Sequence, residues 1–291
     1  MKKKIPEIGT ICPLVPDASA IDKVAAFGLG CAQVCSWNPA LATPEIARAL
    51  KRRCSDAAVR ITAIWGGYGG PVEWNFSRGP VTLGLVPPAY RQMRVQQLKQ
   101  WADFAAEAGA PAVITHCGFL PENMTDPEFE SVAVAIKDVA EHCRKLGLGF
   151  WFETGQETPV ALLRFIEEVG TGNLGINLDP ANLLMYGKGN PIDALAVFGK
   201  YVRAIHAKDG VPPTDGRELG REVKVGTGFV RYPEFIPALL ATGFSGDLTI
   251  EREISGEEQE RDIRDTVDYL RALLPSQAPA DPAKIQCKKN S

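Results

Sequence analysis

The stretch LGINLDP, residues 174–180, is an apolar segment that ends abruptly in a carboxylate and a proline. Successive side chains of a strand point to opposite faces. The three large apolar residues therefore share one face, while Gly175, Asn177 and Asp179 share the other. The apolar face is expected to pack under helices, so the small and polar face, with Asp179 at its end, lines the inside of a barrel.

Three further apolar segments end in the same way. They are GFWFETGQ at 149–156, VRAIHAKDG at 202–210 and DLTIEREIS at 247–255. The same alternation of side chains points Glu153, His206 and Glu251 inward. Parallel barrel strands end at one rim, where barrel enzymes carry their chemistry. These three residues are therefore expected to meet Asp179 at that rim.

Strand-like and helix-like segments alternate along the whole chain. The strand-like segments are 6–14, 31–37, 59–67, 111–118, 147–154, 174–180, 202–209 and 247–253. The segments of helical period are 18–28, 44–57, 88–110, 127–147, 158–170, 191–201, 232–243 and 256–274. Eight strands alternating with eight helices predict an α/β fold, a (β/α)8 TIM barrel, as a single catalytic domain over residues 1–275. The Pro- and Lys-rich residues 276–291 are expected to form a C-terminal extension.

The composition argues against several classes of protein. The 291 residues carry a formal charge of −3 with scattered Lys and Arg, so no nucleic-acid partner is expected. No run of about 18 apolar residues is present, so no membrane span is expected. The seven cysteines are irregularly spaced and are interpreted as reduced thiols. The N-terminal MKKK lacks the apolar segment of a signal peptide, so a cytoplasmic protein is predicted.

Three carboxylates and one imidazole at one rim would repel each other strongly unless a cation compensated them. We therefore predict that Glu153, Asp179, His206 and Glu251 bind one divalent metal ion. This hard, oxygen-rich set leaves room for water or substrate, and it favours Mn²⁺, Mg²⁺ or Co²⁺ over the closed tetrahedral site of a structural Zn²⁺.

The chain resembles the xylose-isomerase-like TIM barrels, in particular the sugar phosphate isomerase/epimerase group that includes D-tagatose 3-epimerase, inosose dehydratase and hydroxypyruvate isomerase. The matching stretches are FETGQ, NLDPANLLMYG, HAKDG and VGTGFVRYPEFIPALLATGFSGDLTIERE. The resemblance covers most of the chain and is strongest over residues 147–253.

The resemblance implies a metal-dependent sugar isomerase or epimerase. In this group a Glu, Asp, His and Glu in this order bind one metal ion, commonly Mn²⁺, and by motif they correspond to Glu153, Asp179, His206 and Glu251. The two glutamates of the group also act as the acid/base pair that moves a proton next to a sugar carbonyl through an enediolate. The substrate would be a small carbohydrate, and homo-oligomers, dimers or tetramers, are frequent in the group.

Four more residues are candidates for substrate binding. His116 ends the fourth strand, where it either binds a substrate hydroxyl or serves as a core or capping residue. Lys208 either contacts a substrate oxygen or pairs with Asp209. Trp65 either forms an apolar wall against the sugar or belongs to ordinary barrel packing. Asn182 stands where the ketose 3-epimerases usually have a histidine, which argues against a narrow assignment to that activity.

Three other functions remain open alternatives. The same enediolate can expel a β-hydroxyl, which would make the protein a lyase that dehydrates a keto-sugar or inosose. The DNA-repair endonuclease IV shares the fold, but it uses three metals, many histidines and a basic face, whereas this chain has three histidines and a negative charge. The last alternative is a barrel that binds a sugar without catalysis.

Overall fold

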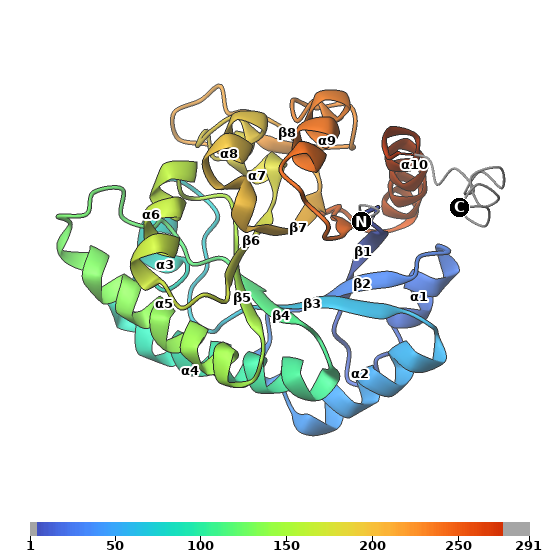
Figure 1. The fold of residues 1–291 in the computed structure, drawn as a ribbon, viewed down its shortest axis with the longest axis horizontal. Coiled ribbons are helices and arrows are strands. Elements are labelled where there is room, and N and C mark those ends of the chain that lie inside the picture. Colours follow the sequence, from blue (N-terminus) through green and yellow to red (C-terminus); the bar gives the residue numbers. More distant parts are fainter. Residues whose placement is uncertain (1–4, 276–291) are drawn as a thin grey trace, which may run out of the picture.

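The computed structural model describes residues 5–275, which form a closed barrel of eight parallel strands surrounded by helices (Figure 1). The barrel strands are β1 (Ile8–Pro13), β2 (Cys31–Ser36), β3 (Arg60–Gly66), β4 (Ala112–Thr115), β5 (Gly149–Glu153), β6 (Leu174–Leu178), β7 (Val202–Ala207) and β10 (Leu248–Ile250). Each strand pairs with its neighbours in chain order, and β10 closes the ring against β1. The predicted (β/α)8 fold is confirmed. The predicted extension at 276–291 lies outside the described residues.

The helix layer follows the expected alternation. The helices are α1 (Ile21–Ala26), α2 (Pro44–Asp56), α3 (Gly79–Thr82), α4 (Pro88–Ala108), α5 (Pro127–Lys145), α6 (Pro159–Val169), α7 (Pro180–Met185), α8 (Pro191–Phe198), α9 (Tyr232–Ala241) and α10 (Glu257–Leu273). Two short 3₁₀ helices, η1 (Pro39–Leu41) and η2 (Gly199–Tyr201), complete the layer. Many helices begin with Pro behind a polar cap: the side chains of Thr43, Asp126 and Thr158 accept a backbone N–H at the start of α2, α5 and α6.

The structure contains elements that the sequence pattern did not predict. Helices α3 and α7 are additional short helices, and the loop after β7 forms a two-stranded antiparallel sheet of β8 (Asp209–Val211) and β9 (Arg221–Val223). This small sheet and α7 both lie near the carboxyl ends of the barrel strands. They therefore add walls to the rim where the polar strand ends meet.

The core has an outer and an inner part. Between strands and helices, the apolar strand faces are fully buried, with Phe150, Phe152 and Ile176 at 1% exposure or less. Inside the barrel, Trp65 and Ile114 pack with two alanines in a separate small cluster. Apolar side chains thus pack inside the barrel below the rim, as is usual for this fold.

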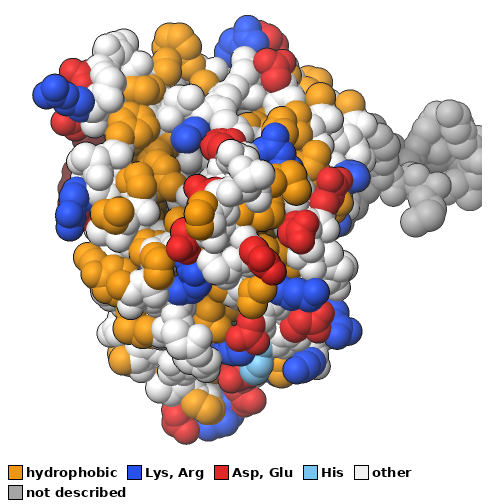
Figure 2. Space-filling model, turned by 90° about the vertical axis from the view of Figure 1, so that its left-hand side faces the viewer, with side chains coloured by type: hydrophobic (Ala, Val, Ile, Leu, Met, Phe, Trp, Pro, Cys, Tyr) orange, Lys and Arg blue, Asp and Glu red, His pale blue; other side chains and the backbone are white. Residues whose placement is uncertain are grey.

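Along the described residues, no helix is both long and apolar enough to cross a membrane. The face shown in Figure 2 carries acidic and basic side chains intermixed, with hydrophobic side chains between them. This face therefore presents no broad field of one charge.

Candidate metal centre

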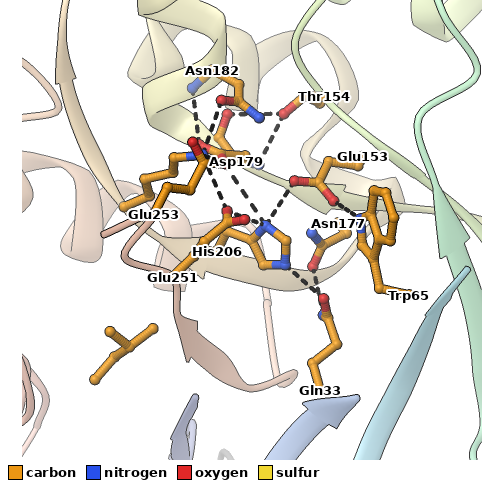
Figure 3. A network of polar contacts seen from close by, with 12 residues as sticks. Gln33, Trp65, Glu153, Thr154, Asn177, Asp179, Asn182, His206, Glu251 and Glu253 are labelled. Atoms are coloured by element: carbon orange, nitrogen blue, oxygen red, sulfur yellow. Dashed lines mark hydrogen bonds and ion pairs between the residues drawn. The ribbon is translucent and has the colours of Figure 1, made fainter. Parts of the chain in front are cut away.

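Four side chains from four barrel strands meet at the carboxyl end of the barrel (Figure 3). Glu153 ends β5, Asp179 follows β6, His206 lies in β7 and Glu251 follows β10. One ligand atom from each of them lies within 4.8 Å of all the others. The geometry therefore brings together the four residues that the strand pattern selected.

His206 lies at the centre of this group. Its Nδ1 atom is 2.8 Å from Glu153 Oε1 and 2.9 Å from Glu251 Oε2. Its Nε2 atom is 2.7 Å from the amide oxygen of Gln33, whose own nitrogen donates to Asn177. Because that oxygen can only accept, Nε2 carries a hydrogen. When the ring gives up its second proton to make room for an ion, the lone pair is left on Nδ1 and points toward the carboxylates.

Three buried polar atoms at this point have no partner in hydrogen-bond geometry within the described part of the chain: Asp179 Oδ2, His206 Nδ1 and Glu251 Oε2. The contacts of 2.8 and 2.9 Å between Nδ1 and the two glutamates are close approaches of charged groups. Buried polar atoms are nearly always satisfied in folded proteins, so each such group needs an explanation. Two carboxylate oxygens and an imidazole nitrogen that face one another match the donor preferences of Mn²⁺ and related divalent ions. The residues present therefore fit a divalent metal ion.

The oxygens of Asp179 are divided between two roles. Asp179 Oδ1 accepts the backbone N–H of Asn182 at 2.9 Å and so caps α7, which leaves Oδ2 directed at the centre. The hydroxyl of Thr154 accepts the N–H of Asp179 and donates to its carbonyl oxygen, both at 2.9 Å. The start of α7 thereby fixes the carboxylate.

The oxygens of Glu153 are divided similarly. The indole N–H of Trp65 donates to Glu153 Oε2, while Oε1 faces His206 and lies 3.7 Å from His116 Nε2. Glu153 is only 2% exposed. Oε2 of this carboxylate is therefore held by Trp65, and Oε1 is directed at the centre of the cluster.

The charges at this site shift the pKa values of its members. Burial alone would lower the pKa of His206, but the carboxylates of Glu153 and Glu251 outweigh it and hold the pKa well above its ordinary value. Burial raises the pKa of Asp179 to about 7. For Glu251 burial acts in the same direction, but Lys208 and His206 outweigh it and hold its pKa below the ordinary value. The cluster thus attracts positive charge strongly.

Lys208 is a buried cation beside the centre, and it is only 1% exposed. Its Nζ atom lies 2.8 Å from Glu253 Oε1, 3.4 Å from Glu251 Oε2 and 3.6 Å from Asp179 Oδ2. The alternative that Lys208 pairs with Asp209 is wrong. The Asp209 carboxylate instead accepts backbone N–H groups of the 226–230 loop, because this loop folds over it.

A cavity of about 660 Å³ lies over the cluster, and the predicted substrate-binding side chains line it in part. His116, Asn182 and Trp65 are among its lining residues, and the His116 ring packs edge-on against Trp65 and Trp74. Lys208 reaches Asn182 Oδ1 at 3.4 Å from behind the lining. Three of the four candidates therefore line one space, and Lys208 lies directly behind Asn182.

The sequence analysis missed three residues that hold the site: Gln33, Thr154 and Glu253. Gln33 is an amide inside the apolar strand CAQVCSW, and a fully buried amide requires hydrogen-bond partners, so its position was a usable signal. Glu253 shares the strand-end alternation with Glu251 and pairs with Lys208. Thr154 offers no comparable signal, because its partner is a backbone group.

A parallel (β/α)8 barrel with three carboxylates and one imidazole at the carboxyl ends of its strands defines a class of proteins. The chain belongs to the xylose isomerase-like TIM barrel family, which it matches over residues 21–273. The family predicted from the motifs is confirmed.

Three individual proteins are similar to this chain to different degrees. A crystal structure of a xylose isomerase domain protein from Planctomyces limnophilus is 35% identical, with a TM-score of 0.87 over 92% of this chain and 97% of that one. An uncharacterized protein of Methanocaldococcus jannaschii is 25% identical over 197 residues, which are 63% of this chain and 62% of that relative's length. A D-tagatose 3-epimerase-like protein has a TM-score of 0.72 at 20% identity, over 92% of this chain and 96% of that one. At this identity the last likeness shows a shared fold alone.

Proposed function

We propose that the protein is a divalent-metal-dependent sugar isomerase or epimerase that uses Mn²⁺, with Mg²⁺ or Co²⁺ as substitutes. The observation that carries this proposal is the convergence of Glu153, Asp179, His206 and Glu251 with three buried ligand atoms left without hydrogen bonds. The family membership and a fold shared with a D-tagatose 3-epimerase-like protein support a sugar substrate. The expected dimer or tetramer and the cytoplasmic location stay predictions.

The metal ion would be held by these four side chains and would polarise the carbonyl and hydroxyl oxygens of a bound sugar. Glu153 removes the proton from the carbon next to the carbonyl, and the negative charge is delocalised as an enediolate. Glu251, on the other side of the cluster, delivers a proton that it first takes up from solvent. Return to the same carbon from the opposite face inverts the centre. Return to the neighbouring carbon, together with transfer of the hydroxyl proton from one oxygen of the enediolate to the other, moves the carbonyl.

The remaining residues orient the sugar. His116 stays neutral near pH 7 because burial lowers its pKa, so it can donate one hydrogen bond and accept another at a substrate hydroxyl. Lys208 and Asn182, which contact each other at 3.4 Å, supply a cation and an amide. Trp65 holds Glu153 and, with Trp37 at a ring distance of 4.7 Å, offers an aromatic wall to the carbon face of a sugar.

Solvent exchange tests this proposal directly. Metal-loaded protein is incubated in D₂O with a panel of ketoses, aldoses, inososes and 3-keto sugars, and deuterium uptake is read by mass spectrometry and NMR. One carbon of one panel member should exchange. Glu153→Gln and Glu251→Gln should each lower the exchange rate by about 10²- to 10⁴-fold, whereas the exposed Glu130→Gln should leave it unchanged.

The same measurement separates the alternatives. A product lighter by one water identifies a dehydratase instead of an isomerase. Purified protein that retains no divalent ion after incubation with Mn²⁺, together with an absence of exchange in every panel member, would contradict the proposal and leave a non-catalytic barrel.

A further inference from the structure

The cavity above the metal centre does not end inside the barrel. It contacts Ile11 and Pro13 of β1, which pair with the inward Gln33 and Cys35 and so face the barrel interior. It also contacts Thr10, which has the opposite orientation and faces the helices. Because neighbouring side chains of a strand lie on opposite faces, a cavity that contacts both sets passes over the end of β1. It therefore has a side arm between the barrel wall and the helix layer.

Two helices form the outer walls of this arm, and Figure 1 shows them on either side of β1. Helix α1 and its C-cap contribute Val24 and Phe27, with Ala20 at the N-cap, and α10 contributes Ile263. These four side chains are apolar, and each helix adds one polar lining residue, Lys23 of α1 and Gln259 of α10. The arm thus differs in character from the other end of the cavity, where Glu153 and the other polar residues lie.

The outside of the arm is closed by long charged side chains instead of packed helix surfaces. Lys23 of α1 and Glu260 of α10 form an ion pair of 2.9 Å, with both side chains about half exposed. The guanidinium of Arg264 lies 4.9 Å from the centre of the Phe27 ring. Exposed pairs of this kind contribute little stability, so the two helices are not locked together across the arm.

The cavity is larger than a single sugar requires, and one part of it is mainly apolar. About 660 Å³ lies well within the range of roughly 300–1,000 Å³ found for sites of drug-sized ligands. A free sugar would gain little from the mainly apolar arm, because most of its hydroxyls would lose hydrogen bonds to water without replacement. An apolar or aromatic group, in contrast, gains free energy by leaving water there.

We propose that the substrate is a sugar that carries an apolar or aromatic substituent, with the sugar at the metal centre and the substituent in the arm between α1 and α10. The sugar part of this inference rests on the proposed function. The arm itself is a ligand subsite that the reaction mechanism does not use.

The arm can be tested without any sugar. The probe is 1-anilinonaphthalene-8-sulfonate, whose rings require apolar space and whose sulfonate can meet Lys23. In fluorescence titrations the metal-loaded protein should bind the probe. Ala20→Trp, which fills the arm, should weaken binding at least tenfold, while Ala89→Trp at an exposed position of α4 should not. Equal binding by all three proteins, or no binding by the wild type, overturns the inference.

A second variant keeps the test conclusive if Ala20→Trp misfolds. Phe27→Ala shortens the apolar wall at a half-buried position and should also weaken probe binding. The melting temperature of each variant shows whether it is folded. A folded Phe27→Ala protein with wild-type affinity would place the probe elsewhere on the surface and contradict the assignment.

The link to the sugar is tested with a matched pair, phenyl and methyl β-D-glucopyranoside, by calorimetric titration in the presence of Mn²⁺. The phenyl compound should bind at least tenfold more tightly, about 1.4 kcal/mol, and Ala20→Trp should remove this preference by weakening the phenyl compound alone. Equal affinities in the wild type overturn the inference. If the arm binds the fluorescent probe but neither glucoside binds and no sugar exchanges deuterium, the proposed function fails and the subsite remains.

Discussion

His206 faces the metal centre through one ring nitrogen and Gln33 through the other. The amide of Gln33 is itself oriented by Asn177. This chain of contacts determines which ring nitrogen carries the hydrogen, and so it keeps a lone pair available for an ion. Gln33 on β2 is not itself a candidate ligand, but it fixes the orientation of His206 on β7.

We predict that Gln33→Leu weakens metal binding by about 10- to 100-fold, the usual effect of losing the partner of a metal-bound histidine. The other tautomer of His206 becomes accessible once Nε2 has no acceptor. Competition with a fluorescent chelator for Mn²⁺ measures the affinity. The exposed Gln96→Leu on α4 is the matched control and should bind Mn²⁺ as the wild type does. Unchanged affinity in Gln33→Leu would show that the ring is oriented by other contacts.

The convergence of the four candidate ligands could be predicted from the sequence because strand alternation determines which face a residue occupies. Alternation does not name the partner of a side chain, since the partner comes from another strand at an unknown register. The contact between Trp65 and Glu153 was missed for this reason, although both residues were selected. The role of Glu253 required knowledge of where the buried cation of Lys208 lies.

Helix α7 is short, yet it positions a ligand. Asp179 Oδ1 accepts the N–H of Asn182 in the first turn of this helix and so caps it. The hydroxyl of Thr154, which follows β5, accepts the backbone N–H of Asp179. The position of the carboxylate therefore depends on the junction of β5, β6 and α7.

Thr154→Val tests this junction, because valine has the same shape and no hydroxyl. The variant should lose about 1–3 kcal/mol of unfolding free energy, since the buried N–H of Asp179 is left without an acceptor. Mn²⁺ affinity should fall as well. Urea unfolding measures the first effect, and chelator competition measures the second.

Thr171→Val is a matched control, because the Thr171 hydroxyl makes no hydrogen bond within the described residues. It should leave metal affinity unchanged and should not lower stability, because no hydrogen bond is lost. If Thr154→Val behaves like this control, the cap alone would be sufficient to hold Asp179.

All eight expected helices are present, with ends that differ by only a few residues, because long amphipathic segments with Pro at the start and Gly near the end carry strong signals. The β8–β9 sheet was not predicted. Its strands have three residues each, too few to show alternation, and its loop is organised by the carboxylate of Asp209. Such a contact depends on tertiary structure, which a local pattern does not contain.

The stability of the whole protein should depend on pH through Glu157, which lies in the loop after β5. This side chain is 3% exposed, and burial raises its pKa to about 8. In the unfolded chain its pKa is near 4.5. Between these two values the folded state binds more protons than the unfolded state, so stability falls as the pH rises from about 4.5 to 8.

Glu157→Gln should therefore have nearly wild-type stability at pH 5 and higher stability than the wild type at pH 8, by on the order of 3 kcal/mol. The neutral amide resembles the protonated acid in shape and needs no charge to be buried. Urea unfolding of both proteins at the two pH values measures the difference. Parallel pH profiles would mean that Glu157 ionises freely in the folded protein.

The side arm of the cavity is a property of the whole molecule that the sequence pattern could not reveal. It depends on the distance between α1 and α10, which lie far apart along the chain. Helical period predicts that each has an apolar face, but it does not say whether the two faces fill the space between them.

Closure of the barrel by β1 and β10 also determines when the fourth ligand is in place. Ile8 pairs with Leu248 and Thr10 with Ile250, and Glu251 follows directly. A nascent chain that has not yet produced β10 already contains three of the four ligands but cannot hold an ion with the full set. The complete set of four candidate ligands therefore exists only once β1 and β10 have paired and the ring is closed.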